Sequence, residues 1–132
     1  MKKMIALLLA AMMVLSMAAC ASKTAAAADS DLAYIQDKGT LVIGITDFEP
    51  MDYKDADGSW IGFDADMAKA FAESLGVTAE FVEIDWDNKI LELDSKTIDC
   101  VWNGMTLTAE VTSTMECSNA YCNNAQVVIV PA

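Results

Sequence analysis

The strongest constraint on the fold is a regular alternation of short β-prone runs with helix-forming segments in the middle of the chain. The runs LVIGIT (41–46), AEFVEI (79–84) and IDCVW (98–102) predict three strands, because they combine apolar and β-branched residues. Helices are predicted between these runs, over 64–76 and 87–96. Strands that alternate with helices form a parallel sheet with helices on its faces. We therefore expect an α/β fold with a mostly parallel sheet flanked by helices.

The helix predicted over 64–76 carries both a start and a stop signal. Asp64 is a favourable N-cap residue, and Gly76 suits the C-terminal end of a helix. Apolar residues recur at helical spacing and would form one buried face: Met67, Ala68, Phe71, Ala72 and Leu75. This segment therefore predicts an amphipathic helix that packs on the sheet.

Three further elements complete the predicted secondary structure. The segment 53–63 predicts two short extended pieces around a turn at Asp57 and Gly58. The DADG within it resembles a calcium loop only faintly, since the first ligand position is not acidic or amide, and a hairpin turn is favoured. A helix is expected from about Ala109, and a last strand is expected over 126–130, just before a proline.

The beginning of the chain is typical of an exported protein. Lys2 and Lys3 precede an apolar run over 4–17, which predicts a signal peptide over residues 1–19. Cys20 follows two alanines and resembles the lipobox of bacterial lipoproteins, which implies cleavage before this cysteine and its lipidation. The alternative is an ordinary signal peptide that is cut nearby, with Cys20 incidental.

The segment that follows the signal peptide predicts a tether. Residues 20–31 are small or polar and show no apolar periodicity, so folded sequence is expected to start near Leu32. The 113 residues from 20 to 132 suffice for one modest hydrophobic core. We therefore expect a single folded unit behind a flexible N-terminal anchor.

Charge and composition exclude several classes of function. The formal net charge is −12, and a chain this acidic lacks the basic face that nucleic-acid binding requires. The sequence contains no histidine and no arginine, which excludes a Ser-His-Asp or Cys-His site and a His-ligated zinc. We expect no metal site, no cofactor and no catalytic residues.

Three cysteines follow Cys20 in the chain. Cys117 and Cys122 could form a disulfide in an exported protein, which would leave Cys100 without a partner. Small buried apolar residues are an equally good interpretation of all three. The sequence leaves this choice open.

Candidate ligand-binding residues follow the ends of the three predicted strands. Phe48 follows the first strand and Trp86 the second, while Asn103, Gly104, Thr106 and Thr108 follow the third. Ligands of parallel α/β sheets bind at the carboxyl ends of the strands, so these residues are expected to converge. Aromatic faces suit an ammonium group, and hydroxyls and amides beside a helix start suit a carboxylate.

Each of these residues also has a purely structural interpretation. Thr108 is a suitable N-cap and Thr106 a suitable strand-end residue, while Phe48 and Trp86 could simply pack at the rim of the sheet. Taken singly, the structural interpretation is the better one for each residue. Their convergence at one edge of one sheet favours a binding site.

The sequence resembles the bacterial extracellular solute-binding proteins of family 3 over nearly all of residues 32–130. The stretches that carry the resemblance are GTLVIGITDFEPMDYKDADGSWIGFDADMAKAFAESLGV, VEIDWDNKI, TIDCVWNGMTLTAE and SNAYCNNAQVVIV. The resemblance implies a two-lobed protein that closes on one amino acid. It places Phe48 and Trp86 beside the ligand, and it places the loop 103–108 against the ligand's α-amino and α-carboxylate groups.

The same resemblance implies an organisation and a cellular role. Residues 32–125 would be an incomplete first lobe, residues 126–132 would begin a strand that crosses the hinge, and the second lobe would be absent. The implied function is that of the substrate-binding component of an ABC importer, anchored by lipid on the outer face of the cytoplasmic membrane. Its partners would be an ABC permease and ATPase, and its ligand a polar or charged amino acid.

The sequence departs from the family pattern at one position that matters for the ligand. Val111 stands where the family pattern T-x-T-x-E-R has an arginine that clamps the ligand's carboxylate. Another group must therefore hold the carboxylate, or the ligand differs from a plain amino acid. Two alternatives on the same fold are a ligand-sensing receptor domain and an enzyme of the cyclohexadienyl dehydratase kind. For the enzyme, Asp47, Glu49 and Asp85 are the acidic residues near the expected cleft.

Overall fold

The computed structural model describes residues 30–131. The predicted signal peptide, Cys20 and nearly all of the predicted tether lie outside the described residues. The chain divides into two units at residue 38, and each is described by itself. The described part of the first unit is the main part of helix α2 (Asp31–Lys38), an element that the sequence patterns did not predict.

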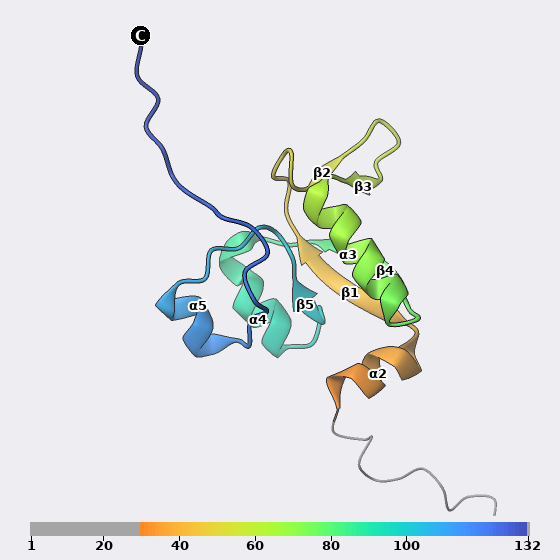
Figure 1. Cartoon of the computed structure of the whole chain (residues 1–132). Helices are drawn as coiled ribbons and strands as arrows, with labels where there is room; N and C mark the ends of the chain where they lie inside the picture. The colour runs from red at the N-terminus through yellow and green to blue at the C-terminus, as the bar shows by residue number, and fades with distance from the viewer. Residues whose placement is uncertain (1–29, 132) are drawn as a thin grey trace, which may run out of the picture. The chain divides into compact units, whose positions relative to one another are not determined.

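The second unit is built on a three-stranded parallel sheet (Figure 1). Strand β1 (Thr40–Ile45) lies in the centre, between β4 (Thr78–Glu83) and β5 (Cys100–Val101). Thr40 pairs with Thr78 and Ile43 with Cys100, and both pairings are parallel. The three strands predicted from the sequence are thus confirmed, although β5 is shorter than the predicted run.

Helix α3 (Phe63–Ser74) covers the sheet by packing against β4 and β1. Its inward face is made of small residues, and Ala65, Ala68 and Ala72 are fully buried. The strand β1 supplies the large side chains opposite them, with Leu41, Ile43 and Ile45 at most 2% exposed. Burying an isoleucine or leucine side chain contributes roughly 1.5–3 kcal/mol, so this helix–strand contact stabilises the unit. The prediction of an α/β fold is confirmed.

The start of α3 differs from the prediction. The helix begins at Phe63 with Gly62 at the N-cap, where φ is +115°, and no side chain caps it. Asp64 lies inside the helix and is fully buried, while its backbone N–H donates to the carbonyl of Met51 at 2.9 Å. The prediction of Asp64 as N-cap was therefore wrong, because its carboxyl group faces the interior and not the amides of its own helix.

The hairpin before α3 is confirmed. Strands β2 (Tyr53–Lys54) and β3 (Trp60–Ile61) are antiparallel, and Asp55 closes the turn between them. Its Oδ1 accepts hydrogen bonds from the backbone N–H of Asp57 and of Ser59, both at 2.9 Å. The acidic residues of this segment therefore hold a turn.

The remaining helices are short. The predicted helix over 87–96 is a 3₁₀ turn η2 (Trp86–Asn88) followed by α4 (Lys89–Asp94), and α5 (Ala109–Thr114) begins where it was predicted. None of the helices in residues 30–131 is long and apolar enough to cross a membrane. The thiols of Cys100, Cys117 and Cys122 are all free.

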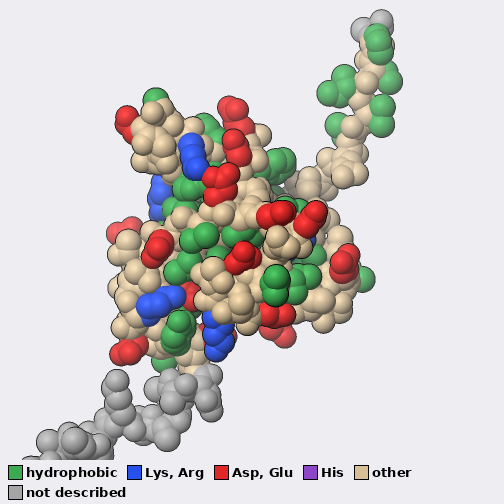
Figure 2. Space-filling model, turned by 180° about the vertical axis from the view of Figure 1, so that it is seen from behind, with side chains coloured by type: hydrophobic (Ala, Val, Ile, Leu, Met, Phe, Trp, Pro, Cys, Tyr) green, Lys and Arg blue, Asp and Glu red, His purple; other side chains and the backbone are tan. Residues whose placement is uncertain are grey.

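The strand predicted over 126–130 does not form. These residues make no backbone hydrogen bond to the rest of the described chain, and the side chains of Val127, Val128, Ile129 and Val130 are 78%, 88%, 92% and 72% exposed. Figure 2 shows these apolar side chains along the segment that extends from the unit. A β-prone run becomes a strand only beside another strand that takes its hydrogen bonds, and none lies beside it in residues 30–131.

Candidate ligand-binding site

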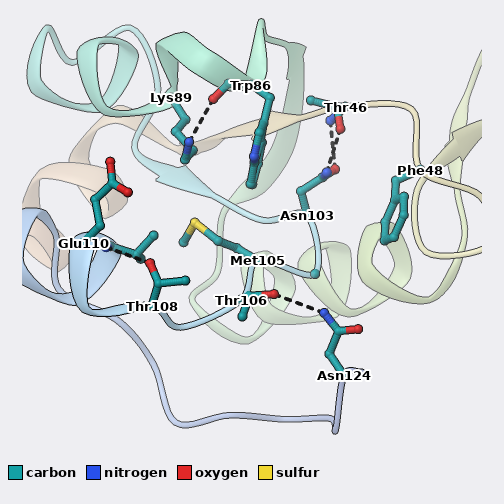
Figure 3. A pocket seen from close by; sticks show the side chains of 12 residues that line it. Thr46, Phe48, Trp86, Lys89, Asn103, Met105, Thr106, Thr108, Glu110 and Asn124 are labelled. Atoms are coloured by element: carbon teal, nitrogen blue, oxygen red, sulfur yellow. Dashed lines mark hydrogen bonds between the residues drawn. The ribbon is translucent and has the colours of Figure 1, made fainter. Parts of the chain in front are cut away.

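A pocket of about 460 Å³ opens at the carboxyl ends of the three parallel strands (Figure 3). All six residues predicted as ligand-binding from the strand ends line it: Phe48, Trp86, Asn103, Gly104, Thr106 and Thr108. It is also lined by Thr46, Lys89, Met105, Glu110, Val111 and Asn124, which the strand-end patterns did not single out. The volume falls within the range of about 300–1,000 Å³ that is common for small-molecule sites.

Asn103 joins the ends of β1 and β5 at the base of this pocket. Its Oδ1 accepts from the backbone N–H of Thr46 at 2.8 Å, and its Nδ2 donates to Thr46 Oγ1 at 2.6 Å. The side chain is nearly buried, with 8% of the residue exposed. Asn103 therefore has a structural task in this protein, because its amide fixes the relative position of two strand ends.

Gly104 gives the loop its path past the pocket. Its φ is +59°, a left-handed conformation that residues with a Cβ adopt at a cost. A Cβ at this position would lie 3.3 Å from Asp64 Oδ2 and 3.7 Å from Phe48 Cε1. The missing side chain thus leaves room for the aromatic ring on one side and the buried carboxyl group on the other.

The two threonines of the loop have different surroundings. Thr108 is the N-cap of α5, and its Oγ1 accepts from the backbone N–H of Val111 at 3.3 Å. Thr106 Oγ1 accepts from Asn124 Nδ2 at 3.1 Å, so a residue far along the chain reaches back to this loop. The structural interpretation of Thr108 as an N-cap is therefore confirmed.

Trp86 and Lys89 form the side of the pocket that follows β4. The Lys89 ammonium lies 4.7 Å from the centroid of the Trp86 ring and donates to the Trp86 carbonyl oxygen at 3.1 Å. Figure 3 shows both side chains pointing into the pocket. Lys89 follows Trp86 by three residues, and this helical spacing was the sequence signal that could have indicated their contact.

Two buried carboxyl groups lie next to the pocket. Asp52 and Asp64 are fully buried, and none of their four carboxyl oxygens accepts a hydrogen bond of good geometry from the described residues. Burial and the neighbouring Asp64 raise the pKa of Asp52 from 3.8 to about 7. Burial also raises the pKa of Asp64, although the side chains of Tyr121 and Trp102 and the backbone of Gly104 partly oppose this shift. The neutral form of each carboxyl group is thereby favoured.

The Cys100 thiol is a further group whose pKa is shifted. Burial and the neighbouring Asp99 raise the pKa of the Cys100 thiol to about 12, so this thiol stays protonated. Within residues 30–131 no cluster of three or more His, Cys, Asp or Glu side chains could hold a metal ion. The acidic residues that an enzyme was expected to use, Asp47, Glu49 and Asp85, do not line the pocket.

A lobe whose parallel strands end at one open pocket has an architecture that suits the binding of a small solute. The chain belongs to the bacterial extracellular solute-binding proteins, family 3, whose family model matches residues 41–132. The resemblance seen in the sequence is thereby confirmed, including the finding that the chain covers only the N-terminal portion of the family.

Two curated relatives illustrate the range of the family. The arginine-binding extracellular protein ArtP of Bacillus subtilis is 32% identical over 130 residues, which are 98% of this chain and 48% of that protein. A cyclohexadienyl dehydratase of Pseudomonas aeruginosa is 33% identical over 95 residues, which are 71% of this chain and 35% of that protein. The chain thus spans half or less of the length of these relatives.

A solved single domain is also similar to this chain. The arginine-bound form of domain 1 from TmArgBP, the T. maritima arginine-binding protein, is 38% identical with a TM-score of 0.58. The match covers 61% of this chain and 64% of that domain. The likeness supports the one-lobe α/β architecture described above.

Proposed function

We propose that this chain binds a polar or charged amino acid and belongs to the substrate-binding component of an ABC importer. The observation that carries the proposal is the convergence of three strand ends on one pocket. The pocket combines two aromatic side chains, Phe48 and Trp86, with a cation, Lys89, and an anion, Glu110. These are the groups that a zwitterionic ligand with an apolar or extended side chain would contact.

The aromatic side chains are the part of the site that suits an amino acid best. An ammonium or guanidinium group over an aromatic ring gains about 0.5–2 kcal/mol, depending on how far it is removed from water. Trp86 is half-buried and Phe48 is 52% exposed, so both residues offer surface to a ligand. The loop 103–108 adds threonine hydroxyls opposite these rings.

The names of the relatives agree with this assignment. An arginine-binding protein matches nearly the whole chain, and a single related domain has been solved with arginine bound. The dehydratase relative keeps an enzymatic alternative in view. Asp47, Glu49 and Asp85 do not line the pocket, so a general acid or base for that alternative would have to be Glu110, the one acidic side chain among the lining residues.

The proposed cellular role includes export and a membrane anchor. Signal peptide cleavage before Cys20 and lipidation of its thiol would hold the protein on the outer face of the cytoplasmic membrane, beside its permease and ATPase. The proposal rests on the sequence pattern of residues 1–20. The mass of the N-terminal peptide from native cells tests it, since an unmodified N-terminus other than Cys20 would exclude the lipid anchor.

The substitution Trp86→Ala tests the proposed binding function. We expect isothermal titration of the chain with L-arginine and a panel of other amino acids to show binding by the wild type. The variant should bind about five- to thirtyfold more weakly, which corresponds to a loss of about 1–2 kcal/mol. Circular dichroism should show an unchanged fold, because Trp86 lies at the rim of the sheet.

The matched control is Leu91→Ala. Leu91 lies on the neighbouring helix α4, is 67% exposed and does not line the pocket, so this variant should bind like the wild type. Unchanged affinity in Trp86→Ala would contradict the proposed contact between Trp86 and the ligand. Failure of the wild type to bind any amino acid would overturn the assignment of an amino-acid ligand to this chain.

A further inference from the structure

We propose that the ammonium group of Lys89 binds the carboxylate of the ligand. The ring and the carbonyl oxygen of Trp86 would hold this ammonium group in place for that contact. The inference rests on the proposed amino-acid-binding function and assigns one group of the ligand to one residue. Val111, at the start of α5, is apolar and buried and offers no charge to a carboxylate. The pocket therefore needs its positive charge from another element.

Lys89 is the one cationic side chain that lines the pocket within residues 30–131. The whole sequence has no arginine and no histidine, so every side-chain cation is a lysine. Among the residues 30–131, Lys89 is therefore the one side-chain cation that a negatively charged ligand group in this pocket would contact.

Three of the other four lysines of the described residues differ from Lys89 in their partners, and the fourth, Lys96, does not line the pocket. Lys38, Lys54 and Lys69 each lie within ion-pair distance of a carboxylate, at 2.6, 2.6 and 3.4 Å from Asp99, Glu83 and Asp66. Lys89 forms no such ion pair with the described residues, although the chain is strongly acidic. Its charge is thus not neutralised by a carboxylate of residues 30–131.

The geometry of Lys89 leaves donors for a ligand. An ammonium group has three N–H donors. One is directed to the Trp86 carbonyl at 3.1 Å, and the ring of the same residue lies 4.7 Å away. Within residues 30–131 one donor is therefore committed to a protein acceptor, while the aromatic contact restricts the side chain. Holding the ammonium in place before binding lowers the entropy that binding would otherwise cost.

The opposite charge of the pocket lies on a different element. Glu110 is the second residue of α5, whereas Lys89 is the first residue of α4, and the two do not form an ion pair. Figure 3 shows them on separate helices with space between their side chains. Two opposite charges kept apart across a pocket match the two charged groups of an amino acid. Lys89 is then the counterpart of the carboxylate, and Glu110 faces the positive end.

A competing role for Lys89 is to fix Trp86 and make no contact with the ligand. The two roles predict different selectivity. A lysine that only positions the tryptophan affects all ligands alike, whereas a lysine that pairs with the carboxylate affects only ligands that carry one. The distinguishing measurement is therefore a comparison of an amino acid with its α-carboxamide, in which the negative charge is replaced by a neutral group.

The experiment uses titration calorimetry of the chain with the amino acid that binds most tightly and with its α-carboxamide. We expect the wild type to prefer the acid by about tenfold or more, since hydrogen bonds to charged groups contribute about 1.5–3 kcal/mol. Lys89→Gln should bind the acid more weakly and the carboxamide about as well as the wild type does. The variant should therefore lose most of the preference for the acid. Lys89→Arg, which keeps the charge, should retain a preference for the acid.

Lys96→Gln is the matched control, because Lys96 is exposed, does not line the pocket and changes the net charge equally when it is replaced. Equal weakening of both ligands in Lys89→Gln would overturn the proposal in favour of a role in positioning Trp86. Unchanged binding of both ligands would overturn it as well. If the wild type bound no amino acid, the proposed function itself would fail; if it bound the acid and the carboxamide equally, only the carboxylate assignment would fail.

Discussion

Two polar clusters lie on either side of the loop at Asn103 and Gly104, and they are built in opposite ways. In the first, which we call the Asn103 junction, the side chain of Asn103 exchanges two hydrogen bonds with Thr46. In the second, the buried acid pair, the four carboxyl oxygens of Asp52 and Asp64 accept no hydrogen bond of good geometry from residues 30–131. The polar atoms of the Asn103 side chain have partners and the carboxyl oxygens do not, although Asn103, Asp52 and Asp64 are all buried.

The difference shows two ways in which the fold supports one binding loop. A buried amide with its partners in place contributes about 1 kcal/mol and defines a single geometry. A buried carboxyl group without partners is costly when it is charged, so it favours the protonated form. The Asn103 junction therefore fixes the strand ends at any ordinary pH, whereas the buried acid pair makes the other side of the loop dependent on pH.

The largest effect is expected from breaking the Asn103 junction. Asn103→Ala would leave the partly buried N–H of Thr46 without its acceptor, and we expect the free energy of unfolding to fall by about 2–3 kcal/mol. Urea unfolding monitored by circular dichroism measures this change. Asn88→Ala is the control, because Asn88 is exposed and its side chain caps no helix. A change below about 0.5 kcal/mol in Asn103→Ala would mean that the junction does not fix the strand ends.

The second effect concerns the pH dependence of stability. The pKa of Asp52 is raised from 3.8 to about 7 in the folded protein, so the fold favours its neutral form. The stability contributed by this shift is present in acid and is lost as pH rises through the folded-state pKa. Wild type should therefore be less stable at pH 8 than at pH 5.5, and Asp52→Asn should remove most of that decrease.

At pH 8 we expect Asp52→Asn to be more stable than wild type by about 1–2 kcal/mol, because each pKa unit corresponds to about 1.4 kcal/mol and the paired carboxyl groups share the shift. Thermal unfolding across this pH range measures it. Asp57→Asn provides the control for loss of one negative charge, since Asp57 is exposed in the hairpin turn. Equal pH slopes for wild type and Asp52→Asn would show that Asp52 is not the group responsible.

The smallest effect is expected at the residue between the two clusters. Gly104→Ala adds a Cβ at a φ of +59° and within 3.3 Å of Asp64 Oδ2. We expect a loss of about 1 kcal/mol in unfolding free energy, mainly from the left-handed backbone conformation. Gly58→Ala is the matched comparison, since Gly58 has a φ of +80° with no neighbour near its Cβ position. A much larger loss in Gly104→Ala than in Gly58→Ala would assign the excess to the contact with the buried acid pair.

The sequence patterns located the sheet and the main helix because those elements have local signals. The run LVIGIT and the apolar face of 64–76 are periodic, and they became β1 and α3 within a residue or two. Residues whose role depends on distant partners were not predictable in this way. Aspartate is a residue type that N-caps favour, so the sequence suggested this role for Asp64. Only the fold shows that Trp102 and Tyr121 lie beside its carboxyl group. The run over 126–130 has the composition of a strand, but no other strand in residues 30–131 lies beside it to take its hydrogen bonds.

The candidate site followed a similar division. The rule that ligands bind at the carboxyl ends of parallel strands was sufficient to bring six residues to one pocket. It did not distinguish residues that hold the loop from residues open to a ligand, as Asn103 and Thr108 show. It also missed Lys89 and Asn124, because they approach the pocket from a helix start and from a segment far along the chain.

The exposed run at residues 127–130 has a consequence for how this chain behaves at high concentration. Four consecutive branched apolar side chains without charge are the composition that stacks into intermolecular β-sheets. A net charge of −12 opposes such stacking, because like-charged molecules repel one another over a distance of about 10 Å at 0.1 M salt. The negative charge that disfavours nucleic-acid binding thus also opposes association between the 127–130 segments of different molecules. Added salt weakens this repulsion.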